Sequence, residues 1–133
     1  MRMLAAIIGR VEVRVAAVRP GALTMVEAVV AGVRLDAEWV GPPAQPGDLV
    51  DVELDIDDVL RWGDTIAMAG AESTLRGGPR LRGTVEDHAQ QILTIRIADG
   101  LAQVELNDGA IDIPPGTAIV VVVEHLKLYP TGI

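Results

Sequence analysis

Four carboxylates at alternate positions, Asp51, Glu53, Asp55 and Asp57, are the residues of this chain whose spacing best suits a binding site. In an extended strand, alternate side chains point to the same face, roughly 6.5–7 Å apart. Such a row fits a solvated outer face, a docking surface for a basic partner or a divalent-ion site. Hard cations require oxygens that converge from a loop, and a straight strand splays its carboxylates. We therefore expect no metal site and retain the other two interpretations.

Arg61 and Trp62 follow the acidic row directly. Tryptophan is enriched at interface hot spots, so Trp62 is a candidate binding anchor. The alternative places it, like Trp39, in the core or under a loop. Like charges on one strand face repel by on the order of 1 kcal/mol or less each, and we expect Arg34, on a neighbouring strand, and Arg61 to offset this repulsion. The predicted partner-binding residues are Asp51, Glu53, Asp55, Asp57, Arg61 and Trp62.

The remaining residue types exclude most catalytic chemistry. The chain has no Cys, which removes thiolate nucleophiles and thiolate metal ligands. Ser73 is the sole serine and lacks the Gly-x-Ser-x-Gly context of a hydrolase nucleophile. His88 and His125 have no partner at metal-ligand spacing, and no glycine-rich phosphate motif is present. We predict that the protein is not an enzyme and has no catalytic residue, cofactor or metal.

The charge balance narrows the choice of partners. The formal net charge is −8, from 19 Asp and Glu against 11 Lys and Arg, and Lys127 is the sole lysine. Nucleic acids and anionic membranes both select basic surfaces, so neither is an expected partner. The apolar segment Met1 to Ile8 is too short for a signal peptide, and no apolar run reaches the roughly 18–20 residues of a membrane span. We predict a cytoplasmic protein, and its Ala, Val, Gly, Arg and Asp usage is typical of GC-rich bacteria.

The elements that position these residues are predicted to be strands. Hydrophobic residues make up 50% of the chain but Phe is absent, so Val, Ile, Leu and Ala must form the core. β-Branched residues favour pleated surfaces, and apolar and polar residues alternate with a period of two. Asp99-Gly100 predicts a two-residue hairpin turn. The predicted strands cover residues 11–15, 23–30, 33–39, 50–56, 66–68, 82–86, 93–97, 101–106, 118–124 and 125–129.

The pattern occurs twice along the chain. Pro46-Gly47 opens an alternating block that closes at Gly63, and Pro115-Gly116 opens one of equal length that closes at Gly132. Upstream, Gly9-Arg10-Val11 aligns with Gly83-Thr84-Val85, at a larger offset. We predict an all-β fold of two small OB-like five-stranded barrels, in tandem or intertwined. The predicted division is a first barrel at residues 1–69, a Gly/Pro linker at 70–81 and a second barrel at 82–133.

A single barrel of this size would be marginally stable, so we expect the two to pack together. The nearly continuous apolar run from Ile119 to Val123 is a candidate for the shared surface or for an oligomer interface. We therefore predict a homo-oligomer.

A family resemblance supports the same architecture. The stretch Pro115-Gly116-Thr117, followed by Ile119 to Glu124 and by Leu126-Lys127-Leu128-Tyr129-Pro130, resembles the closing strands of a TOBE-type OB-fold. Arg19-Pro20-Gly21 is similar to an Arg-Pro-Glu sequence near such barrels, with Gly in place of Glu. A tandem of such units resembles the two-repeat molbindins, which bind oxyanions. The resemblance implies a small-ligand carrier in which Arg19 and Lys127 contact an oxyanion at barrel or subunit interfaces.

Two functional hypotheses follow from the sequence, and a third, an enzyme, would require a cleft lined by His125 or His88 with carboxylates. The first is a non-enzymatic binding or assembly module that contacts a protein partner through the acidic strand face, or that self-associates. The second is the oxyanion carrier that the resemblance implies. Bound molybdate, tungstate or sulfate would favour the carrier, and a co-purifying polypeptide would favour the module.

Overall fold

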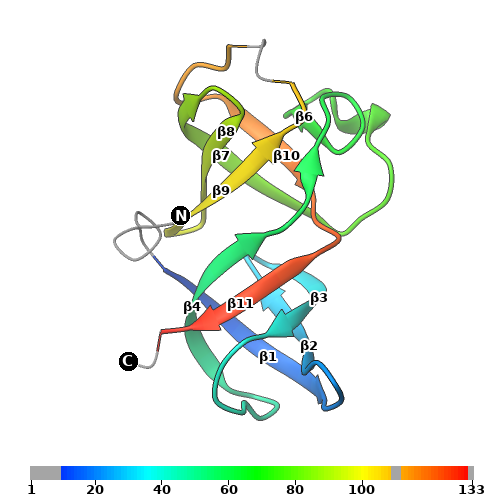
Figure 1. Ribbon diagram of the computed structural model, residues 1–133, viewed down its shortest axis with the longest axis vertical. Coiled ribbons are helices and arrows are strands. Elements are labelled where there is room, and N and C mark those ends of the chain that lie inside the picture. Colours follow the sequence, from blue (N-terminus) through cyan, green and yellow to red (C-terminus); the bar gives the residue numbers. More distant parts are fainter. Residues whose placement is uncertain (1–9, 109–111, 132–133) are drawn as a thin grey trace.

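The computed structural model describes residues 10–108 and 112–131, so the expectations for Met1 to Ile8, Gly9 and Gly132 lie outside the described residues. Within them the fold is all-β (Figure 1). No helix in this part of the chain has the length and hydropathy to cross a bilayer. The elements are β1 (Val11–Arg19), β2 (Met25–Val30), β3 (Val33–Trp39), β4 (Leu49–Ile56), β5 (Val59–Leu60), β6 (Ile66–Met68), the 3-10 turn η2 (Glu72–Thr74), β7 (Arg80–Ala89), β8 (Ile92–Ile97), β9 (Gly100–Leu106), β10 (Ala118–Val122) and β11 (Leu126–Pro130).

The period-two patterns identified most strands correctly. In β1 and β4 the apolar residues at alternate positions are buried and the charged residues between them face outward. Tight turns join β2 to β3 and β8 to β9, and each has a residue with positive φ at its first position, Ala31 (49°) and Ala98 (53°). The second hairpin turn is thus Ala98-Asp99, not Asp99-Gly100, because Gly100 already pairs with Ile97 in the ladder.

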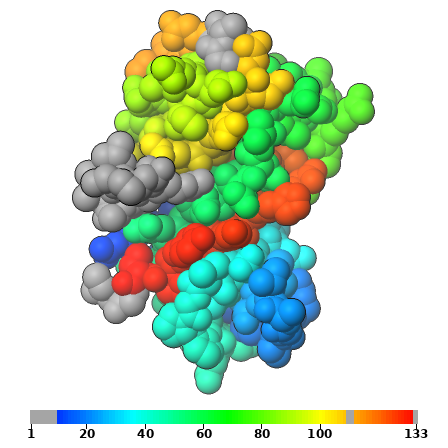
Figure 2. All heavy atoms as spheres, in the orientation of Figure 1, coloured from blue at the N-terminus to red at the C-terminus, as the bar shows by residue number. Residues whose placement is uncertain are grey.

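Five strands form a closed barrel in the order β1-β2-β3-β11-β4. The strand that closes it, β11, comes from the C-terminal end of the described chain. It runs parallel to β3, where Leu128 pairs with Trp39, and antiparallel to β4, where Leu128 pairs with Leu54. Figure 2 shows β11 (red) on the surface between β3 (cyan) and β4 (green).

The other strands form a six-stranded sheet in the order β5-β9-β8-β7-β10-β6, which is not a closed barrel. Its outermost strands, β5 and β6, come from the interval predicted to form the first barrel, residues 1–69. A turn at residues 61–65 joins them, and the carbonyl of Arg61 accepts hydrogen bonds from the N–H groups of Asp64, Thr65 and Ile66. Figure 1 shows the two sheets stacked along the long axis, with the β4–β5 and β10–β11 connections crossing between them.

Each sheet includes strands from the other part of the chain, and we call this the exchange. Hydrogen bonds at the strand ends show that it runs in both directions. The N–H of Val40, after β3, donates to the carbonyl of Leu128 in β11 over 2.9 Å. The N–H of Asn107, after β9, donates to the carbonyl of Leu60 in β5 over 2.9 Å. β5 is parallel to β9 as β11 is parallel to β3. The predicted intervals 1–69 and 82–133 therefore each contribute strands to both sheets.

Matching bonds also locate the internal repeat. The N–H of Gly47 donates to the carbonyl of Val15 over 2.7 Å, and the N–H of Gly116 donates to that of Val85 over 2.8 Å. β1 and β7 both shift register directly after this valine. The two predicted Pro-Gly turns thus make the same bond to a valine of β1 and of β7. The predicted match of Val11 with Val85 is wrong, because the counterpart of Val85 is Val15.

Most of the predicted linker (residues 70–81) is packed against the second sheet, and its last two residues, Arg80 and Leu81, begin β7. We call residues 69–79 the flap. Leu75 of the flap is buried against Val120 and Val122 on the outer face of β10. The Arg80 guanidinium donates to the carbonyls of Gly77, Glu72 and Leu75, at 3.2, 3.4 and 3.0 Å. Figure 1 shows this segment beside β6 and β10 at one side of the second sheet.

The flap corrects the expectation for the apolar run on β10. Ile119, Val121 and Val123 point into the main core, and the two valines between them lie under the flap. The run is buried within the chain, so it does not form an exposed oligomer interface. Its inward residues belong to the core that the two sheets share. The main core is one continuous cluster that extends through both sheets.

Candidate functional site

The acidic row lies on the outer side of β4. Val52, Leu54 and Ile56 point into the core, and the carboxylates between them face outward. Asp51 is exposed, Glu53 and Asp55 are half-buried, and Asp57 is exposed one residue after the strand ends. We call this row, Asp51, Glu53, Asp55 and Asp57, the acidic face.

The charge that offsets the acidic face comes from an unexpected strand. β4 pairs with β1 and β11, not with β3. Lys127 of β11 lies opposite Asp55, and its Nζ is 3.8 Å from Asp57 Oδ2. Arg34, expected to face β4, instead forms an ion pair with Glu27 at 2.6 Å. The predicted role of Arg34 is therefore wrong, because β11 separates its strand from β4.

Further acidic residues flank this face. Glu12 of β1 pairs with Asp51, and Glu38 of β3 pairs with Lys127. Both lie at outward positions of their strands. Lys127 therefore has carboxylates on both neighbouring strands, Asp55 and Asp57 on the β4 side and Glu38 on β3, and the net charge of the surface is negative.

Trp62 and Arg61 lie elsewhere, in the 61–65 turn of the second sheet. Trp62 is half-buried and lines an apolar cavity of about 350 Å³ with Gly63, Ala67, Met68, Ala71 and Thr74. Its Nε1 is buried and has no hydrogen-bond partner in the described part of the chain. Arg61 is exposed, and its N–H donates to Thr65 Oγ1 over 2.8 Å. Trp39 is in the core, and its Nε1 donates to the carbonyl of Pro42 over 2.7 Å.

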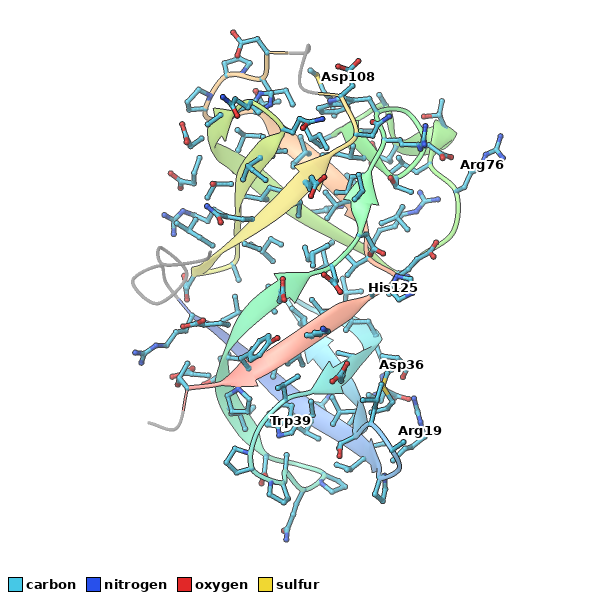
Figure 3. All side chains as sticks on the ribbon, viewed as in Figure 1. Arg19, Asp36, Trp39, Arg76, Asp108 and His125 are labelled. Carbon is cyan, nitrogen blue, oxygen red and sulfur yellow. The ribbon has the colours of Figure 1, made fainter. Side chains whose placement is uncertain are left out.

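The crossing point of the two connections holds a His–Asp pair. Asp58 Oδ2 accepts the N–H groups of Glu124 and His125, each over 3.0 Å. Asp58 Oδ1 lies 2.6 Å from His125 Nδ1. Figure 3 places His125 between the two sheets. The carboxylate therefore joins the β4–β5 connection to the β10–β11 connection.

The electrostatics of the pair favour its charged form. Partial burial would raise the pKa of Asp58, but the hydrogen bonds from His125 and the backbone, together with the histidine charge, lower it. The hydrogen bond with Asp58, and then the charge of that carboxylate, raise the pKa of His125. The sequence did not indicate this pair, because 67 positions separate the two residues. In the described ranges no group of three or more His, Asp or Glu side chains could hold a metal ion.

Beside the crossing point is a cleft of about 350 Å³, which we call the junction cleft. Asp57 belongs both to its lining and to the acidic face, so the two are continuous. Two large apolar side chains of the lining are exposed, Val59 at 54% and Ile92 at 41%. Both pair with Glu105 of β9, which lies between them. The lining consists of Ile56, Asp57, Asp58, Val59, Ile92, Gln103, Val104 and Glu105.

Each of the two predicted oxyanion ligands lies beside a carboxylate. Arg19 ends β1, where its guanidinium lies 3.2 Å from Asp36 Oδ1 on an exposed surface (Figure 3). Lys127 is on β11 beside Asp57. Each basic group already faces a carboxylate, which opposes the approach of an anion.

Comparison with protein families, curated proteins and solved structures found no match.

Proposed function

We propose that this protein is a non-enzymatic binding module that holds a basic segment of a partner protein on the acidic face of β4. The observation that carries the proposal is the excess of outward carboxylates on one strand of a closed barrel. Such a barrel keeps the charges in fixed positions before a partner arrives. Fixed, complementary charges speed encounter and exclude partners of the wrong sign.

We also propose that the second sheet is an OB-like barrel in which β5, the 61–65 turn and β6 take the place that β11 takes in the first. The matching bonds of Val40 with Leu128 and of Asn107 with Leu60 support this. On this proposal the protein is an intertwined pair of TOBE-like units. The oxyanion carrier, the cytoplasmic location and self-association stay predictions. The carboxylates beside Arg19 and Lys127 give the carrier no added support.

Charge reversal tests the binding proposal with a matched control. Asp51→Lys combined with Glu53→Lys changes two exposed or half-buried positions on β4, and Asp87→Lys combined with Asp99→Lys makes the same change of net charge at exposed positions of the second sheet. Proteins captured from the host by tagged wild type are identified by mass spectrometry and then purified for titration.

We expect the β4 variant to weaken binding of the purified partner by at least about tenfold, and the control variant to bind like wild type. Raising the salt from about 0.05 to 0.5 M should also weaken wild-type binding, because exposed charges are screened. Equal affinity of the two variants for the partner would refute the proposal.

A further inference from the structure

The junction cleft combines exposed apolar side chains with carboxylates. Val59 and Ile92 are exposed although both are large and apolar, and they stand on either side of Glu105 across three adjacent strands. Asp57 supplies a second carboxylate at the side where β4 ends. An occupant that satisfies this lining needs an aliphatic part and a positive charge.

Resting on the proposed function, we propose that the junction cleft binds the side chain of a lysine from the basic segment of the partner protein. The four-carbon stem of lysine would lie between Val59 and Ile92, and its ammonium group would lie at Glu105 and Asp57. Lysine side chains commonly place their methylenes on apolar surface while the ammonium group keeps polar contacts. The cleft thus gives the acidic face a point of specificity at one end.

Of the three carboxylates that line the cleft, Asp57 and Glu105 are accessible to a ligand. Asp58 also lines the cleft, but His125 and two backbone N–H groups already occupy its oxygens. Lys127 Nζ is 3.8 Å from Asp57 Oδ2, and that carboxylate is 55% exposed, so it retains room for a second cation. Glu105 is exposed and forms no ion pair with the other described residues.

Other occupants fit the lining less well. A divalent cation gains nothing from contact with the two aliphatic side chains. It would also lack a converging set of three ligands, because the described residues contain none. An anion would meet three carboxylates. A free polyamine has the right chemistry for the cleft alone, but it would not use the row of carboxylates that continues along β4. A polypeptide covers both.

The test is an NMR titration of the whole protein with a peptide of five lysines, the same peptide acetylated on every side chain, and spermidine. We expect the lysine peptide to shift the amide signals of residues 57–59, 92 and 103–105. Acetylation should abolish the effect, because it removes the charge. Glu105→Gln and Ile92→Ser should each weaken binding by about fivefold. Asp99→Asn, an exposed change in the β8–β9 turn, should leave it unaltered.

The outcomes separate this inference from the proposed function. If Glu105→Gln and Ile92→Ser bind like wild type while the Asp51→Lys and Glu53→Lys variant does not, the lysine site is refuted and the acidic face stands. If all variants bind alike, both are refuted. Binding of spermidine as tight as that of the peptide would assign the cleft to free polyamines and would overturn the proposal. Loss of binding by an unfolded variant is recognised from its NMR spectrum, and the second cleft variant then decides.

Discussion

A glycine inside β7 gives the sharpest test of how the two sheets are packed. A Cβ added at Gly83 would lie 2.4 Å from Ile95 Cγ2 and 2.8 Å from the carbonyl oxygen of Arg96, well inside van der Waals contact. Gly83 pairs with Ile119. This glycine is required by close packing of the core and not by an unusual φ, so its substitution tests the packing directly.

In the closed barrel, the two positions that correspond to Gly83 and Ile95 hold a large and a small side chain in the opposite order. There Val13 occupies the position of Gly83, and Ala28 occupies the position of Ile95, since Val15 pairs with Ala28 as Val85 pairs with Ile95. The larger side chain is on β1 in one sheet and on β8 in the other. We therefore predict that Gly83→Val is destabilising and that Ile95→Ala partly rescues it.

The magnitudes follow from the two contacts. Gly83→Val should cost about 3 kcal/mol, the upper end for overpacking, because one clashing atom belongs to the backbone and cannot rotate away. Ile95 is fully buried, so Ile95→Ala alone should cost about 3 kcal/mol through the cavity it leaves. Independent effects would total about 6 kcal/mol. We expect the double variant to lose only about 3–4 kcal/mol, because the valine fills the space that the isoleucine vacates.

Urea denaturation of the four proteins measures this coupling. The midpoint should shift in each single variant with an unchanged slope, since the surface exposed on unfolding stays similar. Gly21→Ala is the control, because its Cβ would meet its nearest atom only at 3.4 Å, and its cost should stay within about 0.5 kcal/mol. Additive losses in the double variant would refute the correspondence of the two sheets.

Three further predictions concern the crossing point, the flap and the exchange. Because Asp58 raises the pKa of His125 and His125 lowers the pKa of Asp58, their pair stabilises the fold fully between about pH 4 and 6.5, the ordinary pKa values of the two groups. This stabilisation is lost as pH rises through the raised pKa of His125, and also as pH falls through the lowered pKa of Asp58. Urea midpoints measured from about pH 5 to 9 should show this loss in wild type but not in Asp58→Asn, and identical profiles would contradict it. In the flap, Leu75→Ala should cost about 2 kcal/mol and Arg80→Ala should speed proteolysis of the flap, whereas unchanged cleavage would show that the guanidinium does not hold it. Finally, a chain split at Gly77–Gly78 should yield two fragments that are each poorly folded but associate one to one, as seen by circular dichroism and size-exclusion chromatography, and independent folding of either fragment would contradict the reciprocal exchange.

Local patterns predicted what is locally determined. The side chains of β1 and β4 alternate between core and surface because a strand has a period of two, and this was enough to place Asp51, Glu53 and Asp55 on one outward face. The Pro-Gly turns were equally informative, since their geometry recurs in both halves. The acidic face could therefore be predicted from the sequence.

The pairing of the strands could not be predicted from local patterns. Nothing local states that β11 lies between β3 and β4, and so the sequence suggested Arg34 where the structure has Lys127. The same exchange brings Asp58 to His125. Leu75 was missed for a different reason, because a single apolar residue among Gly, Pro and polar residues has no periodicity and its segment is typical of a linker.

The exchange also decides where a ligand site can form. Residues 56–59 of the junction cleft come from the first half of the chain and residues 92–105 from the second, and neither half alone has a wall on both sides. The Asp58–His125 contact fixes the crossing connections beside that cleft. The site is therefore completed only when both halves have folded together, and any ligand that binds there stabilises the exchanged state over partly folded ones. A tandem of independent barrels would lack this coupling, so binding in the cleft and cooperative unfolding of the two sheets should be lost together in a variant that separates them.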